Sequence, residues 1–350
     1  MFSTYKPDDV TILLKDINGL VEPMSTKTRE RLIQSGKHYS EMLPIEYEPS
    51  AEYLNCYYDA LSRYSTITAE AVANVADWIY AEKSEDVVLV SLARAGTPIG
   101  ILIKHYIQNK YHCDVKHYTI SIIRGIGIDK NAMNFILAHH NPKTVQFVDG
   151  WTGKGAIQNQ LNEAMRDYPN VDPGLAVLSD PAHIADKFGT QEDFLIANSC
   201  LNSIVSGLLS RTFLRSDIIG KDDFHGAAFY SSLMDKDLTY QFISCIENKF
   251  NYAGTYNHIA VVNDHSGLDE VRKIAKEFKI SGINLIKPSI GEATRVLLRR
   301  LPWKVLVHSL NDEEHLGHLY QLAREKNVEM IEYPLKNYKA CGLIRSLTDT

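Results

Sequence analysis

The sequence has few cysteines, no long unbroken apolar run and no stretch of low complexity. Five of its 350 residues are cysteine, an odd number, and no two of them form a C-x-x-C pair. This spacing argues against a zinc cluster or a disulfide framework and favours a reducing compartment. The most apolar stretch, residues 87–103, is interrupted by an arginine, two glycines and a proline. It is therefore too short and too broken to span a bilayer.

The N-terminus and the charge give further exclusions. The first ten residues, MFSTYKPDDV, have no basic segment followed by an apolar run, so no signal peptide is expected. A formal net charge of −6 excludes a simple basic nucleic-acid coat. Residues 268–350 nevertheless hold 14 basic and 11 acidic residues, which indicates a second task for this part unless the asymmetry is chance. We expect a cytoplasmic protein with no membrane partner.

The hydrophobic pattern predicts an α/β fold with a parallel sheet. Short β-branched runs alternate with stretches of helical periodicity, which is typical of this class. The expected strands of the first part are residues 87–91, 115–123, 144–148, 175–178 and 193–197, and the expected helices are 53–82, 99–106, a segment ending at 165, and 200–209. The expected strands of the last part are 258–262, 283–286, 304–308 and 328–332, and its helices are 291–300 and 316–326. We predict an N-terminal extension (1–50), a main domain (51–255) and a small C-terminal domain (256–350).

The most informative motif is VQFVDGWTGKGAI, residues 145–157. A buried strand delivers Asp149 to the carboxyl edge of the sheet, where ligands of open α/β sheets bind. The turn that follows predicts exposed backbone N–H groups at a helix N-terminus, which form a phosphate cradle. Its residues are Thr152, Gly153, Lys154 and Gly155.

Two common phosphate motifs do not fit this segment. A Walker A motif requires glycine where Val148 stands and Ser or Thr where Gly155 stands. The Rossmann pattern G-x-G-x-x-G is absent. An ordinary strand–turn–helix with glycines for packing stays open as an alternative.

The segment resembles the phosphoribosyl-pyrophosphate (PRPP) loop of type I phosphoribosyltransferases. It departs from that loop in having one acid instead of two and one residue fewer before the T-G pair. SLARAGT, residues 91–97, resembles the pyrophosphate loop of the same family, and ISIIRGIGIDK, residues 120–130, occupies the place of its flexible loop. The pyrophosphate-binding residues that the resemblance implies are Ala93, Arg94, Ala95 and Gly96.

The resemblance implies transfer of phosphoribose from PRPP to an unidentified nucleobase-like acceptor. Asp149, Arg94 and Arg124 would be its catalytic residues, with Mg²⁺ held mainly by PRPP oxygens and no metal site built from the protein. Asp180, at a strand end, would contact the acceptor base. A homodimer is the expected assembly.

The order of the domains and residues 175–214 resemble a narrower family. It is a bacterial family of tellurite/stress-resistance operons in which a phosphoribosyltransferase-like domain precedes a small α/β/α Pelota-type RNA-binding domain; some members are labelled cysteine protease StiP. KPSIGEATRVLLRR, residues 287–300, resembles the helix of the Pelota superfamily that binds kinked RNA. The resemblance implies structured RNA as a partner, bound by Lys287, Gly291, Glu292, Arg295 and Arg299.

Two alternatives to the transferase remain open. Cys200 begins an expected helix, where a thiol has a lowered pKa, and His225 could accept its proton, which together would make a cysteine hydrolase. The same two residues could instead line the pocket of the acceptor base. The other alternative is a non-catalytic regulator that binds RNA and senses a nucleotide.

Overall fold

The structure, a computed structural model, describes residues 2–254 and 264–344. Its main part is a six-stranded sheet in the order β1-β4-β3-β7-β8-β9, with all neighbours parallel. The bounds of these strands are β1 Thr11–Ile12, β3 Val88–Leu92, β4 Lys116–Ile120, β7 Val145–Val148, β8 Leu175–Ser179 and β9 Lys187–Thr190. The expected α/β architecture with a parallel sheet is confirmed. The segment 1–50 supplies the edge strand β1 of this sheet.

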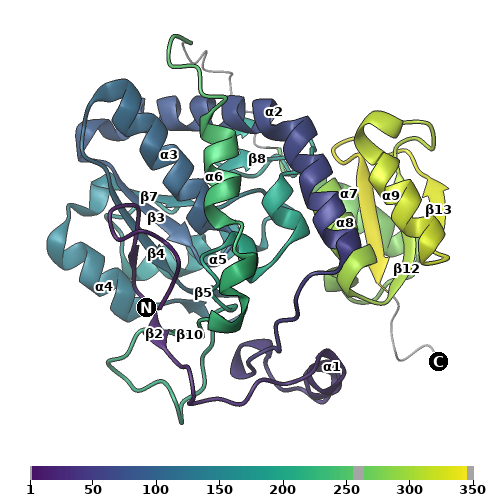
Figure 1. Ribbon diagram of the computed structural model, residues 1–350, viewed down its shortest axis with the longest axis horizontal. Coiled ribbons are helices and arrows are strands. Elements are labelled where there is room, and N and C mark those ends of the chain that lie inside the picture. The colour runs from purple at the N-terminus through teal and green to yellow at the C-terminus, as the bar shows by residue number, and fades with distance from the viewer. Residues whose placement is uncertain (1, 255–263, 345–350) are drawn as a thin grey trace.

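Helices cover both faces of the sheet (Figure 1). Along β3, Leu89 packs into one core, whereas Val88 and Val90 pack into the other, as the two-residue period of a strand requires. The first core lies under α2, α3 and α6, and the second under α4 and α5. These helices are α2 Ala51–Lys83, α3 Gly96–Tyr111, α4 Lys130–His139, α5 Ala156–Ala164 and α6 Thr239–Glu247; α1 is Thr26–Gln34.

The last part of the chain forms a separate four-stranded mixed sheet with its own helices. The strand order is β11-β14-β12-β13, and only the β12–β13 pair is parallel. The bounds are β11 Ile286–Pro288, β12 Pro302–Val307, β13 Glu329–Glu332, β14 Ala340–Ile344, α7 Ser266–Glu277, α8 Ile290–Arg299 and α9 Glu313–Glu325. The expected later small domain is therefore present, although β13 is not the last strand. The strand expected at 258–262 lies outside the described residues, and the domain boundaries stay a prediction.

Two expected elements of the main part are wrong. Residues 193–197 are not a strand; β9 lies just before them. Residues 200–209 are not a helix but follow two short 3₁₀ turns, η5 Ala197–Cys200 and η6 Ser203–Val205. The physical reason is the backbone: Asn202 has φ −114° and ψ −113°, and Gly207 and Leu208 have positive φ, none of which an α-helix accommodates.

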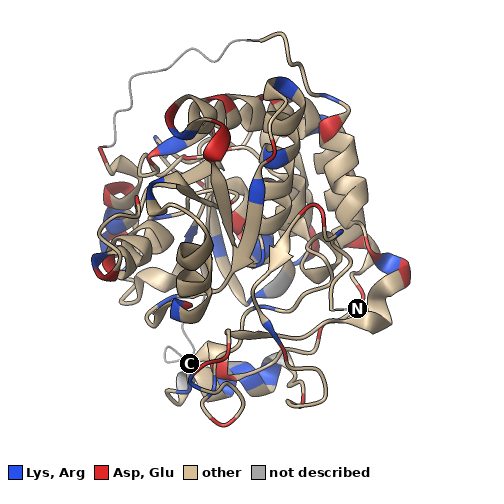
Figure 2. Ribbon diagram, turned by 90° about the vertical axis from the view of Figure 1, so that its left-hand side faces the viewer, with Lys and Arg blue, Asp and Glu red and all other residues tan. Residues whose placement is uncertain are grey.

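Four short strands complete the fold. β2 Lys15–Asp16 pairs with β10 Gly226–Ala227, and β5 Ile122–Ile123 pairs with β6 Gly127–Ile128. Basic and acidic residues are interspersed over the outer helices (Figure 2). In the described part of the chain no helix is both long enough and apolar enough to cross a membrane.

Candidate functional site

A cleft of about 770 Å³ lies where the carboxyl edge of the large sheet meets the C-terminal unit. The loops after β3 and β7 form its floor, and the β5–β6 loop contributes Arg124. β11 and α8 form the wall from the C-terminal unit. Eight basic and four acidic side chains line this cleft, although the chain as a whole is acidic. The basic residues are Arg29, Arg94, Arg124, Lys154, Arg211, Lys287, Arg295 and Arg300.

The turn 152–155 lies at the start of α5, as the sequence predicts. Gly155 is its N-cap with φ +78°, and a side chain there would also meet Ile184. Gly153 faces open space, since a Cβ on it would find nothing within 4 Å. The turn therefore presents backbone to the cleft at one glycine and needs the other for its conformation.

The C-terminal unit forms hydrogen bonds with the turn 152–155. The Lys154 ammonium donates to the carbonyl oxygens of Ile283 and Ile286, and Tyr338 donates its hydroxyl to the carbonyl of Gly153 at 2.6 Å. Burial, together with nearby Lys287, lowers the pKa of Lys154 to about 8. The amine is thus part of the contact between the two units.

Asp180, at the end of β8, stabilises the same turn from within the main part. Its carboxylate accepts hydrogen bonds from the hydroxyl of Thr152 and from the backbone N–H groups of Ile184 and Ala185. Burial raises its pKa to about 6. The structure thus shows Asp180 as an anchor for the turn.

Asp149 lies at the end of β7 on the floor of the cleft. Burial raises its pKa to about 7, although the Gly150 N–H donates to it at 2.8 Å and Arg295 lies near enough to oppose the shift. Gly96 packs on the same strand end: a Cβ there would lie 2.6 Å from the carbonyl oxygen of Val148. This close approach brings the N-terminus of α3, and the segment 93–95 before it, to the cleft beside Asp149.

Arg94 and Arg211 form the centre of a basic cluster. Arg94 donates to the carbonyl of Leu209 at 2.9 Å. Arg211 lies 4.9 Å from the centre of the Tyr39 ring, and burial together with Arg29 and Arg94 lowers its pKa to about 9. Sequence reasoning missed Arg211, because it lies in the unpatterned segment SRTFLRS and reaches the cleft only through the fold.

Three of the five expected RNA-binding residues of the C-terminal unit face this same cleft. Lys287, Glu292 and Arg295 line it. Burial alone would raise the pKa of Glu292, but Arg295 and Lys287 outweigh it and hold that pKa below its usual value. Gly291 lets α8 approach η5 closely, since a Cβ there would lie 3.1 Å from the Ser199 hydroxyl. The side chain of Arg299 lies outside what the structure describes.

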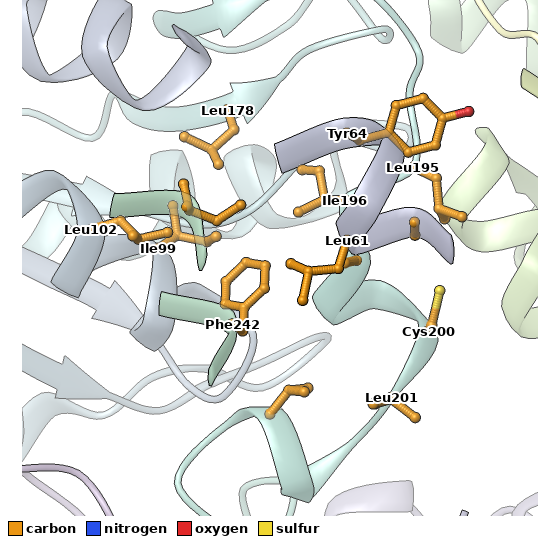
Figure 3. Packing of buried hydrophobic residues seen from close by; sticks show 14 of the residues in the cluster. Leu61, Tyr64, Ile99, Leu102, Leu178, Leu195, Ile196, Cys200, Leu201 and Phe242 are labelled. Carbon is orange, nitrogen blue, oxygen red and sulfur yellow. The ribbon is translucent and has the colours of Figure 1, made fainter. Parts of the chain in front are cut away.

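Cys200 and His225 occupy different surroundings. Cys200 is fully buried in the first core (Figure 3). Its Sγ lies 3.6 Å from that of Cys56. Because it ends a 3₁₀ turn, the expected helix N-terminus that would activate its thiol is wrong. The His225 ring shares a hydrogen bond with the Ser121 hydroxyl at 2.8 Å, and its backbone N–H donates to Asp129. Burial lowers the pKa of His225 and so disfavours its imidazolium form.

No group of three His, Cys, Asp or Glu side chains that could hold a metal ion occurs within residues 2–254 and 264–344. The Mg²⁺ expectation depended on PRPP oxygens as ligands. It remains a prediction and has no part in the function proposed below.

The fold and the site define a two-part α/β protein with a basic cleft between its parts. The family described as tellurite-like stress resistance cysteine protease StiP matches residues 3–247, and the PELOTA RNA binding domain matches residues 265–346. The chain is 37% identical to the "Cysteine protease StiP" of Acinetobacter baylyi, over 98% of this chain and 94% of that protein. The chain therefore belongs to the StiP family, with a C-terminal PELOTA domain, as the narrower resemblance predicts.

Two solved structures share a smaller likeness. A hypoxanthine-guanine phosphoribosyltransferase of Bacillus anthracis is 17% identical, with a TM-score of 0.27, and the match covers 36% of this chain and 77% of that one. The xanthine-guanine-hypoxanthine phosphoribosyltransferase of Helicobacter pylori is 16% identical, with a TM-score of 0.22, over 39% and 77%. Likenesses of this size carry no argument about activity.

The expected phosphoribosyltransferase activity is wrong. The matching family and the relative that covers nearly the whole chain are both described as cysteine proteases, and nothing supports PRPP or a nucleobase as partners. The roles in PRPP chemistry that the resemblance implied for Asp149, Arg94 and Arg124 lose their basis with it. A turn of backbone amides with nearby arginines binds phosphate in many unrelated proteins, so these loops do not specify one reaction.

Proposed function

We propose that this chain binds RNA in the cleft between its two parts. The observation that carries the proposal is the lining of the cleft, where eight basic side chains stand against four acidic ones in a chain with a net charge of −6. Guanidinium and ammonium groups gathered in one concave site attract an anion such as phosphate. The match of residues 265–346 to an RNA binding domain supports RNA as the anion, since Lys287 and Arg295 of that domain line the same cleft.

The proposal predicts salt-dependent RNA binding by the full chain. About four phosphate contacts by cleft residues would release counterions and give a log–log salt slope near −3, at about −0.7 per contact for single strands. The measurement is a fluorescence anisotropy titration of labelled RNA at several salt concentrations. A slope near zero, or no saturable binding at ~100 μM protein and low salt, would remove RNA from the proposed function.

A cysteine-dependent hydrolase activity is a second proposed function, favoured by the family to which the chain belongs. Cys200 is the best-placed thiol for it, because it directly precedes Leu201 and Asn202 on the cleft wall. Because the thiol faces the core, the reaction requires the turn 197–201 to move.

Replacing Cys200 with alanine is expected to abolish hydrolysis of a casein or mixed-peptide substrate. The matched control is Cys56→Ala, which removes the neighbouring buried thiol and should leave turnover in place. Iodoacetamide labelling followed by peptide mapping should locate the reactive thiol at Cys200, and His225→Ala tests whether that imidazole takes part. Turnover that survives in Cys200→Ala would refute this second function and leave RNA binding untouched.

A further inference from the structure

One wall of the cleft carries large apolar side chains that are open to solvent. Tyr47 is 63% exposed and Ile45 is 38% exposed, and both line the cleft. Pro44 and Pro49 belong to the same segment and the same wall. Exposed apolar side chains gathered in a concave site usually contact a ligand. We refer to residues 44–49 as the apolar wall.

The apolar wall is fixed to the rest of the chain before any ligand arrives. The Ile45 N–H donates to the carbonyl of Met24 at 3.0 Å, and the Glu46 carboxylate accepts from the Ser203 N–H at 3.2 Å. A surface that is already ordered loses less conformational entropy on binding. The exposed Tyr47 ring is therefore available as a platform.

The charge of the wall is compatible with an anionic ligand. Of its two carboxylates, Glu48 forms an ion pair with Lys236 at 3.0 Å and Glu46 accepts the N–H of Ser203, while basic side chains outnumber acidic ones eight to four along the cleft. The basic side chains of Arg211, Lys287 and Arg295 line the same cleft. Proteins that bind single-stranded nucleic acid combine these two features, cations for the backbone and aromatic rings on which bases stack.

The size of the cleft restricts the form of the RNA. A volume of about 770 Å³ falls within the range of pockets that hold one small-molecule ligand. A duplex cannot enter a space of this size, whereas one or two unpaired nucleotides can. We infer that the cleft takes an unpaired segment of RNA, with a base stacked on Tyr47 beside Ile45 and its phosphates toward the arginines; this inference rests on the proposed RNA binding.

The test compares ligands with and without bases. Tyr47→Ala should weaken binding of a labelled single-stranded oligoribonucleotide by about 5- to 100-fold, the effect of losing one base–aromatic stack. Its affinity for inorganic polyphosphate, a polyanion without bases, should equal that of the wild type. Tyr47→Phe should bind RNA normally, because it keeps the ring. Tyr58→Ala is the matched control, since Tyr58 is 45% exposed on α2 and does not line the cleft.

Three outcomes would overturn the inference. These are unchanged RNA affinity in Tyr47→Ala, an equal loss of polyphosphate affinity in that variant, and a blunt RNA duplex that binds the wild type as tightly as the single strand. If Tyr47→Ala binds RNA as tightly as the wild type does, the proposed stacking on the apolar wall is excluded, whereas the proposed RNA binding still stands. Wild-type protein that binds neither RNA nor polyphosphate removes both.

Discussion

Replacing Arg211 and Arg295 together with glutamine is expected to weaken RNA binding by about 100-fold or more, since a lost charged hydrogen bond costs about 1.5–3 kcal/mol. Both side chains line the cleft, one from the main part and one from α8. Their removal takes a positive charge from each side of the proposed phosphate path. The measurement is an anisotropy titration of the double variant and of each single variant with the same labelled RNA.

The matched control is Arg272→Gln. Arg272 lies on α7 of the same C-terminal unit, where it forms an exposed ion pair with Asp269 at 3.0 Å and does not line the cleft. The Arg272→Gln variant should bind RNA with an affinity within about twofold of that of the wild type, because one exposed charge outside the contact area is largely screened. An equal loss in this control would mean that bulk charge, and not the cleft, attracts RNA.

The single variant Arg211→Gln carries an additional expectation about stability. Burial and neighbouring arginines lower the pKa of Arg211, which means that the folded protein disfavours its charge. Without ligand, Arg211→Gln should therefore unfold at the same temperature as the wild type or a higher one. Loss of RNA affinity with retained stability is the pattern of a binding residue. A large drop in melting temperature would indicate a structural role.

Much of the cleft could be predicted from local sequence. Asp149 and the turn 152–155 follow a buried β-branched run, and Arg94 follows another. Parallel strands end at the same edge of a sheet, so these residues had to meet there. The activity could not be predicted in the same way. A phosphate-binding turn indicates which chemical group of a ligand is bound, but the same turn occurs in proteins that catalyse different reactions.

The residues that sequence reasoning missed are those placed by contacts between distant segments. Tyr47 and Arg211 belong to no motif, and each reaches the cleft because its loop packs against other segments. Asp193 was expected inside a strand of residues 193–197, since FLIA is an apolar run like the other buried strands. The structure instead uses this aspartate to hold the C-terminal unit. A carboxylate that accepts hydrogen bonds from backbone N–H groups far away in sequence produces no recognisable pattern in the sequence around it.

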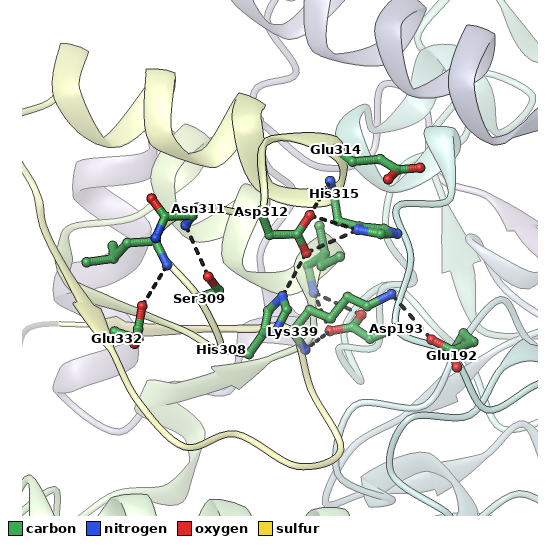
Figure 4. Close-up of polar contacts among 12 residues, drawn as sticks. Glu192, Asp193, His308, Ser309, Asn311, Asp312, Glu314, His315, Glu332 and Lys339 are labelled. Carbon is green, nitrogen blue, oxygen red and sulfur yellow. Dashed lines mark hydrogen bonds and ion pairs between the residues drawn. The ribbon is translucent and has the colours of Figure 1, made fainter.

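Asp193 joins the two parts of the molecule through backbone hydrogen bonds. Its carboxylate accepts from the N–H of Ile290, at 3.0 and 3.1 Å, and from the N–H of Lys339, at 2.9 Å (Figure 4). Ile290 is the first residue of α8, the helix that carries Glu292 and Arg295. The position of α8 at the cleft therefore depends in part on one buried side chain.

Asp193→Ala is expected to destabilise the protein by about 2–6 kcal/mol, because it leaves two backbone N–H donors unpaired at about 1–3 kcal/mol each. The matched control is the preceding residue: Glu192 forms an ion pair with the Lys339 ammonium at 3.3 Å and is 66% exposed, so Glu192→Ala should cost no more than about 1 kcal/mol. Urea unfolding followed by tryptophan fluorescence measures both variants. Equal midpoints for the two would contradict the anchoring role.

The pH dependence of the same site gives an independent check on Asp193. Burial raises its pKa to about 7, above the ordinary value of 3.8. A raised pKa means that the folded state favours the protonated form, so this contribution to stability is full below about pH 4 and is lost as the pH rises to about 7. Asp193→Asn, which keeps an acceptor oxygen and cannot titrate, should gain stability relative to the wild type across that interval.

The RNA affinity of Asp193→Ala should fall as well, because a loosened α8 no longer holds Arg295 against the cleft. Normal RNA affinity in a destabilised Asp193→Ala protein would separate the anchor from the binding site.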